Sequence, residues 1–244
     1  MKLLVVGGAG YVGRIIGPVL ETVFDCTYFD IKPIKGCEDR TILADVSNEE
    51  KVQQAVAGMD AIIYLAMGVG PKSPNPAENP NVNDINAAFD VNVRGLYHFL
   101  HASLTGGTKR FIYVSTLSVY HQRWKDIVLD ENTPADSWHP YGLSKRAGEF
   151  ICGCAAQAHP GACITAIRLI TPRNEQDWPP HRYDPTKPRN GCATGPKDTQ
   201  RLFVAAVNWD KPGFHLLQAS GDISNSYLPN TRANELFGWL PKNE

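Results

Sequence analysis

The chain has 244 residues, which is enough for one α/β domain with a small appended lobe, and 43% of them are hydrophobic. A formal net charge of -1 gives no support to nucleic acid or an anionic membrane as a partner. No apolar run is long enough to span a bilayer, and the first residues lead into a predicted strand rather than a signal peptide. The cysteines form neither a Cys-x-x-Cys pair nor zinc spacing with histidine, so we expect reduced thiols in a cytoplasmic protein and no metal site.

A glycine-rich turn connects the first predicted strand, residues 2–6, to a predicted helix over 11–23. Glycines at positions 7, 10 and 13 form a variant of the G-x-G-x-x-G dinucleotide fingerprint. Gly7 would permit the tight turn, and Gly10 would let backbone N–H groups approach a pyrophosphate. Gly13 would let the helix pack close to the strand, with the phosphate charge at the helix N-terminus.

The second predicted strand, residues 26–30, ends in Asp30, which lies 23 residues after Gly7. An acidic residue at about this distance is expected to bind the adenosine ribose hydroxyls. Because a carboxylate repels a 2′-phosphate, Asp30 favours NAD over NADP, although Lys32 and Lys35 nearby weaken that preference. An ordinary turn residue at a strand end is the alternative interpretation of Asp30.

Predicted strands and helices then alternate as far as residue 169. The strands are expected at 41–43, 60–66, 109–115 and 163–169, and the helices at 48–57, 82–103 and 141–158. Repetition with short links is typical of an α/β fold with a doubly wound parallel sheet. The Gly- and Pro-rich stretch 68–81 is predicted to be a loop at the carboxyl end of a strand, where such sheets bind ligands.

Tyr141 and Lys145 are four residues apart, so they share one face of the predicted helix. An ammonium group beside a phenol favours the phenolate, which could exchange a proton near neutral pH. Thr116 follows a central strand, and its hydroxyl could bind a substrate oxygen beside Tyr141. Tyr-x-x-x-Lys also arises by chance on helices, and Thr116 could instead satisfy loop backbone.

Together these motifs resemble the extended short-chain dehydrogenase/reductase superfamily, in its NAD-dependent epimerase/dehydratase family. The resemblance covers residues 1–170 and rests on Gly7-x-x-Gly10-x-x-Gly13, Asp30, Asp45-Val46, Leu65-Ala66, Asn92-Val93-Arg94-Gly95, Ser115-Thr116-x-x-Val119-Tyr120 and Pro140-Tyr141-x-x-x-Lys145. It implies a Rossmann-like NAD-binding domain at 1–170. The remainder, 171–244, would be a small C-terminal substrate lobe, partly integrated with that core. The resemblance also implies a homodimer built from the helices near 82–103 and 141–158.

The resemblance assigns roles to individual positions. Tyr141 would be the catalytic acid/base, Lys145 would lower the pKa of the phenol and bind the nicotinamide ribose, and Thr116 would orient the substrate oxygen. The positions expected to bind NAD are Gly7, Gly10, Tyr11, Val12, Gly13, Asp30, Asp45, Val46, Leu65, Ala66, Tyr141 and Lys145. Substrate contacts are expected from Thr116, Leu117, Ser118 and Arg173.

The C-terminal segment 218–241 is similar to the ending of uronate dehydrogenases, which oxidise a free hexuronic acid with NAD. The chain departs from them at Leu117-Ser118, where they carry Asn-His, so its substrate could differ from a uronic acid. Only 74 residues follow Ile170, which is short for the lobe that binds a nucleotide sugar. One of Arg173, Arg182 and Arg189 could pair with a substrate carboxylate or phosphate; solvated loop charges are the alternative.

Three functions stay open. The first is an NAD-dependent oxidoreductase with net NADH production, acting on a CH–OH group of a sugar or sugar acid. The second is an epimerase or dehydratase with no net redox change, and the third is a non-enzymatic NAD-binding sensor. A sensor has no need of Thr116, Tyr141 and Lys145 together, so their presence argues against it.

Overall fold

The computed structural model describes residues 1–68, 82–120, 128–178 and 192–244. These residues form one parallel sheet with the strand order β3-β2-β1-β4-β5-β6-β7. The strands are β1 (Lys2–Val6), β2 (Asp25–Asp30), β3 (Thr41–Leu43), β4 (Ala61–Tyr64), β5 (Arg110–Thr116), β6 (Cys163–Leu169) and β7 (Gly213–Ala219). The order reverses between β1 and β4, and this is the switch point at which doubly wound sheets bind ligands. The predicted Rossmann-like fold class is confirmed.

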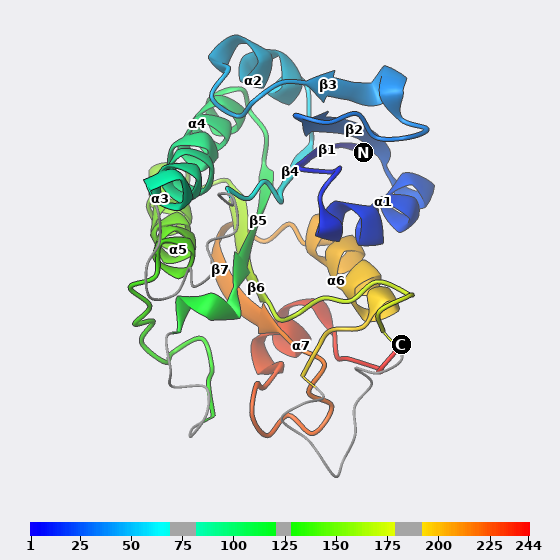
Figure 1. Cartoon of the computed structure of the whole chain (residues 1–244), viewed down its shortest axis with the longest axis vertical. Helices are drawn as coiled ribbons and strands as arrows, with labels where there is room; N and C mark the ends of the chain where they lie inside the picture. The colour runs from blue at the N-terminus through cyan, green and yellow to red at the C-terminus, as the bar shows by residue number, and fades with distance from the viewer. Residues whose placement is uncertain (69–81, 121–127, 179–191) are drawn as a thin grey trace.

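Helices cover both faces of the sheet (Figure 1). One face carries α1 (Tyr11–Val23) and α6 (Pro196–Asn208), which pack against each other, and α7 (Thr231–Phe237). The other face carries α2 (Glu49–Val56), α3 (Val82–Phe89), α4 (Leu96–Thr105) and α5 (Pro140–Ala158).

Each face of the sheet has its own apolar core. In β1, Leu3 and Val5 point to the α1 side, whereas Leu4 and Val6 point to the α4 side. This alternation follows from the two-residue period of a strand. Both sets are fully buried, as expected for a parallel sheet with helices on both faces. The near-continuous apolar runs in the sequence therefore predict the central strands.

The predicted helix over 82–103 is divided in the structure. Between α3 and α4 lies a π-helical segment, η2 (Asp90–Gly95), which inserts a wider turn. Its Asn92 is fully buried, accepts a hydrogen bond from the Gly68 backbone N–H (3.1 Å) and donates to the Ser144 hydroxyl (3.0 Å). The wider turn therefore places an amide that joins the end of the β4 segment to α5.

The part of the chain after residue 170 contributes a strand to the same sheet and helices to its cover. The strand β7 pairs with β6 along its whole length, and α6 packs on α1. A smaller apolar cluster is separate from the two cores of the sheet and is formed by Val119, Tyr120, Leu129, Ile170, Cys192 and Leu228. Among the residues described, no helix has the length and apolar character needed to cross a membrane.

A single carboxylate organises the loop that follows β7. Asp222 is buried, and its Oδ2 accepts hydrogen bonds from the backbone N–H groups of Ser226, Tyr227 and Leu228. Burial alone raises the pKa of Asp222, but these bonds and one from the Ser224 hydroxyl outweigh it. The pKa of Asp222 therefore lies below the ordinary aspartate value, and its ionised form stabilises the folded loop.

Candidate active site

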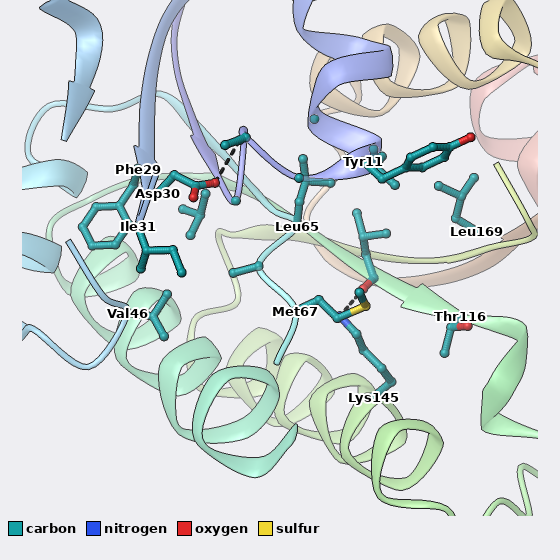
Figure 2. Close-up of a pocket in the computed structure, with 18 of the residues that line it drawn as sticks. Tyr11, Phe29, Asp30, Ile31, Val46, Leu65, Met67, Thr116, Lys145 and Leu169 are labelled. Carbon is teal, nitrogen blue, oxygen red and sulfur yellow. Dashed lines mark hydrogen bonds between the residues drawn. The ribbon is translucent and has the colours of Figure 1, made fainter. Parts of the chain in front are cut away.

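A cavity of about 700 Å³ runs along the carboxyl ends of the central strands (Figure 2). Every position that the sequence predicts for NAD binding, from Gly7 to Lys145, lines this cavity. The wall also contains residues beyond the expected NAD and substrate contacts: Val6, Ala9, Phe29, Ile31, Lys32, Ala44, Met67, Val114, Ser115, Leu169, Thr171 and Pro172. Several of these flank the expected positions directly, so a wider window around each motif would have found them.

The glycine turn at the start of α1 packs against neighbouring backbone so closely that side chains at two of its positions would collide with it. Gly7 has φ 85°, and a Cβ there would lie 2.6 Å from the backbone nitrogen of Ala66. A Cβ at Gly13 would lie 2.2 Å from the carbonyl oxygen of Gly8, so the first turn of α1 sits directly on the loop. The N-terminus of α1 has neither a side-chain cap nor an acidic residue in its first turn, which suits an anion.

One end of the cavity is acidic. The carboxylate of Asp30 accepts hydrogen bonds from the backbone N–H of Ala9 (2.8 Å) and of Lys32 (3.0 Å), so it joins the glycine turn to the segment after β2. Each carboxylate oxygen keeps a further lone pair for a ribose hydroxyl. Asp45 lies at the same end, and hydrogen bonds from the side chain and backbone of Ser47 lower its pKa.

The opposite end holds Thr116, Tyr141 and Lys145, well away from Asp30 in Figure 2, which labels Thr116, Lys145 and Asp30. Thr116 is the last residue of β5, and its hydroxyl is near enough to the Tyr141 phenol to oppose the rise in the pKa of that phenol. Tyr141 and Lys145 come from the first two turns of α5, which begins at Pro140. The Nζ atom of Lys145 donates to the Val114 carbonyl (2.9 Å). The three predicted catalytic residues therefore converge.

The pKa values of this trio differ from the sequence-based expectation. Burial raises the pKa of Tyr141, and the Thr116 hydroxyl only partly opposes this. Burial also lowers the pKa of Lys145 to about 7, against the opposing effects of Cys152 and Glu149. The expected lowering of the phenol pKa by Lys145 is therefore not found, because the ammonium group is directed to the Val114 carbonyl and desolvation dominates.

The predicted substrate contacts are only partly brought together. Ser118 lines the cavity and donates its backbone N–H to Thr116 Oγ1 (3.1 Å). Leu117 is not part of the wall, because the short turn η3 (Leu117–Val119) directs it into the apolar cluster around Val119. Arg173 follows the wall residues, and Arg182 and Arg189 lie outside the described residues.

A contact between distant parts of the sequence joins the start of α1 to the segment after β6. The hydroxyl of Tyr11 donates to Asp177 Oδ2 (3.1 Å) and accepts from the backbone N–H of Asn174 (3.0 Å); we name this set of contacts the Tyr11 clasp. The clasped segment begins at Thr171, a cavity residue with φ 43°. A left-handed conformation is strained for a β-branched residue, and such strain is typical of functional sites.

Comparison with known proteins decides the family. The sequence profile described as the NAD dependent epimerase/dehydratase family matches residues 3–182. The chain belongs to the NAD-dependent epimerase/dehydratase family. It is therefore an enzyme that uses NAD, and the cavity fits this cofactor: the free helix N-terminus lies between the acidic end and the Thr116–Tyr141–Lys145 end.

Relatives within the family differ in how much of their length they share with this chain. L-arabinose 1-dehydrogenase (NAD(P)(+)) of Haloferax volcanii is 27% identical, over 99% of this chain and 96% of the relative. N-acetyl-alpha-D-glucosaminyl-diphospho-ditrans,octacis-undecaprenol 4-epimerase of Escherichia coli O157:H7 is 28% identical, but over 62% of this chain and 42% of its own length. Thus the chain matches less than half of that epimerase.

Solved structures agree with the fold. Glucuronic acid dehydrogenase from Chromohalobacter salexigens superposes with a TM-score of 0.80, at 23% identity, over 100% of this chain and 85% of that structure. At this identity the similarity establishes the common architecture and leaves the substrate to be argued from the site itself.

Proposed function

We propose that this protein is an NAD-dependent dehydrogenase that oxidises a hydroxyl-bearing carbon of a free sugar or sugar acid. The observation that supports it most is that Thr116, Tyr141 and Lys145 line the same end of the cavity, with the Thr116 hydroxyl near enough to the Tyr141 phenol to affect its pKa and Lys145 one helical turn further along α5. A hydroxyl, a phenol and an amine at one point suit the removal of a proton from a substrate alcohol.

Each of the three side chains has its own role in the proposed reaction. Bound NAD supplies the acceptor for the hydride. Tyr141, as phenolate, takes the proton of the substrate hydroxyl, and Thr116 donates a hydrogen bond that stabilises the negative oxygen. Lys145, whose Nζ is held by the Val114 carbonyl, binds the nicotinamide ribose. Because all three side chains come from the ends of β5 and α5, the cavity fixes their positions before substrate arrives.

Net oxidation is favoured over epimerisation by the extent of the sequence similarity to the two relatives described above. The arabinose dehydrogenase matches from end to end, whereas the epimerase has more than half its length without a counterpart here. Apart from β7, α6 and α7, which belong to the sheet and its helical cover, the described residues after 170 add Cys192 and Leu228 to the apolar cluster around Tyr120. This is a small structure in which to bind a nucleotide as well as its sugar.

The test is a panel of free aldoses, their phosphates, uronic acids and nucleotide sugars, each incubated with the enzyme and NAD. Steady accumulation of reduced nicotinamide with a free sugar or acid supports the proposal. Formation of a product isomer from a nucleotide sugar without such accumulation identifies an epimerase. Tight NAD binding with no turnover of any compound identifies a sensor, and either of these results rejects the dehydrogenase.

Two side chains are proposed to distinguish among substrates. Ser118 stands exposed on the wall beside Thr116 and can bind a second sugar hydroxyl. Arg173 follows Thr171 and Pro172, and its Nε is buried without a hydrogen-bond acceptor among the described residues. We propose that this guanidinium binds a substrate carboxylate or phosphate. Arg173→Met should then raise KM for acidic sugars and leave KM for neutral sugars unchanged.

We also propose a homodimer formed through α3, α4 and α5, which lie side by side on one face of the sheet (Figure 1). Large apolar side chains on these helices are exposed, among them Val82 (68%), Tyr97 (56%) and Phe150 (74%). A second copy would cover them. Light scattering should give twice the chain mass, and Phe150→Asp should give a monomer. Val23→Asp, at an exposed site on α1, is the matched control.

A reducing compartment such as the cytoplasm is proposed from the thiols. All six cysteines are unpaired, and Cys154 is exposed. Disulfides are rare where glutathione keeps thiols reduced, so six free thiols suit that environment. Recovery of the protein in a periplasmic or secreted fraction would reject the assignment.

A further inference from the structure

A buried ion pair lies immediately behind the proposed catalytic residues. Arg168 of β6 donates from Nε to Glu149 Oε1 (2.9 Å) and from Nη2 to Oε2 (2.8 Å), which is a two-pronged pairing with the carboxylate. The two side chains are 4% and 7% exposed. Removing both charges from water costs free energy that such a pair often fails to recover. A contribution to stability alone therefore does not account for it.

The carboxylate of Glu149 connects two of the elements that carry the reaction. Its Oε1 accepts a hydrogen bond from the Ser115 hydroxyl (2.6 Å), and Ser115 directly precedes Thr116. Glu149 also lies one helical turn after Lys145 on α5. Arg168 is the residue that pairs with Ser115 across β5 and β6. The ion pair therefore joins β5, β6 and α5 at the level of the proposed reacting groups.

Two bonds set the position of α5 against β5. Lys145 bonds to the carbonyl of Val114, and Glu149 bonds to the side chain of the next residue, Ser115. One contact from each of two successive helical turns fixes both the height and the rotation of the helix. The spacing between Tyr141 on α5 and Thr116 on β5 depends on both.

The guanidinium extends the same network to the substrate side. Arg168 donates from Nη1 to the Tyr120 hydroxyl, and its central carbon lies 5.1 Å from the centre of the Tyr120 ring. Tyr120 follows the turn that carries Ser118, and its hydroxyl donates to the Asp130 carbonyl (2.7 Å). Neither Glu149 nor Arg168 lines the cavity, so neither is placed to contact substrate or cofactor.

We propose that Glu149, held by Arg168, is a positioning residue for hydride transfer: it sets the Tyr141–Thr116 spacing through Ser115 and Lys145. The inference rests on the proposed function of the trio and adds a residue to it. Misplacement of reacting groups by about 1 Å can cost about a hundredfold in rate, so a loosened helix is expected to lower kcat more than cofactor affinity.

The titration of Lys145 gives a readout that needs no turnover. The titratable groups around it are Glu149 and Cys152 on α5, Tyr141 on the same helix and Tyr113 of β5, whose ring centre is 5.0 Å from Nζ. The segment η2 packs on α5 with the uncharged Asn92. Glu149 and Cys152 raise the pKa of Lys145, and burial lowers it more. A change in the position of α5 therefore alters the pH midpoint of Lys145.

The test compares Glu149→Gln, Ser115→Ala and the double variant Glu149→Gln/Arg168→Met with the wild type. Glu149→Gln should lower kcat about tenfold or more while the Kd for NAD stays within about twofold. Because this variant leaves Arg168 charged and unpaired, it should also be less stable. The double variant removes both charges and should regain stability but not kcat. Recovery of kcat together with stability would show a purely structural pair and overturn the proposal.

Ser115→Ala changes no charge and keeps the ion pair, so it remains decisive if the other variants fold poorly. We expect a loss in kcat of about threefold, a melting temperature lowered by the loss of one hydrogen bond to the buried carboxylate, and a shifted Lys145 midpoint, observed by NMR of the labelled lysine Cε and assigned with Lys145→Met. An unmoved midpoint overturns the proposal even if the wild type turns over no sugar. Inactivity of the wild type on the whole panel, with a shifted midpoint, rejects the proposed function alone.

Discussion

Replacement of Tyr141 by phenylalanine gives the sharpest prediction for the proposed chemistry. The change removes one hydroxyl and leaves the ring. The described neighbour of that hydroxyl is Thr116, which keeps its bond with the backbone N–H of Ser118. The free energy of unfolding should therefore change by no more than about 1 kcal/mol. Since a positioned acid/base supplies about 10²–10⁴-fold, kcat should fall by about 10³-fold, or about 4 kcal/mol in activation free energy.

The assay measures the initial rate of NADH appearance with the best sugar from the panel, together with the Kd for NAD by calorimetry. The affinity should stay within about threefold of the wild type, because the rest of the cavity wall is unchanged. Tyr97→Phe, on the exposed face of α4, is the matched control and should leave both values unchanged. If Tyr141→Phe turned over at the wild-type rate, the acid/base role drawn from the Thr116–Tyr141 contact would be refuted.

Three further predictions follow from the charges of the site and the fold. Asp30→Ala should lower the NAD-to-NADP preference in kcat/KM by about tenfold, because repulsion of a 2′-phosphate is lost; an unchanged ratio contradicts the assigned role. Burial raises the pKa of Tyr141, so kcat/KM for oxidation should rise with pH above neutrality and that for reduction should fall, and flat profiles would contradict this. Asp222→Asn should cost about 1.5–3 kcal/mol in urea unfolding at neutral pH. The pKa of Asp222 is lowered by folding, so this stabilisation is fully present above the unfolded value and is lost as pH falls through the folded one. If the difference in free energy of unfolding between wild type and Asp222→Asn does not shrink on acidification, the lowered pKa of Asp222 is contradicted.

Local sequence patterns predict the sheet and the cofactor end of the site because the features there depend on residues that are close to one another in the sequence. The glycine at position 7 is needed by its own φ of 85°, and the apolar run of β1 is continuous in the sequence and buried on both faces. The Tyr141–Lys145 spacing likewise depends only on helix geometry. For such features, a window of a few residues contains the physical cause.

Other features depend on tertiary contacts that the sequence does not reveal. Nothing in the segment around Thr171 predicts its positive φ, and the backbone N–H groups of Ile170 and Arg173 on either side bond to Ala219 and Thr194, which are distant in the sequence. The π-helical segment is associated with the buried bonds of Asn92 to α5 and to Gly68, and the inward direction of Leu117 depends on the apolar cluster beneath it. The raised pKa of Tyr141 follows from desolvation that only the folded chain creates.

The Tyr11 clasp joins residues 166 positions apart, one on the first helix and one beyond the sixth strand. The NAD-binding part of this enzyme, residues 1–170, therefore cannot be moved to another protein without losing these contacts. A chimaera that grafted residues 1–170 onto another substrate lobe would keep the glycine turn and Asp30 but lose the wall at Thr171 and Pro172, together with the partners of the Tyr11 hydroxyl. Exchange of specificity within the family should therefore be attempted at junctions after Asp177, where the graft carries its own clasp.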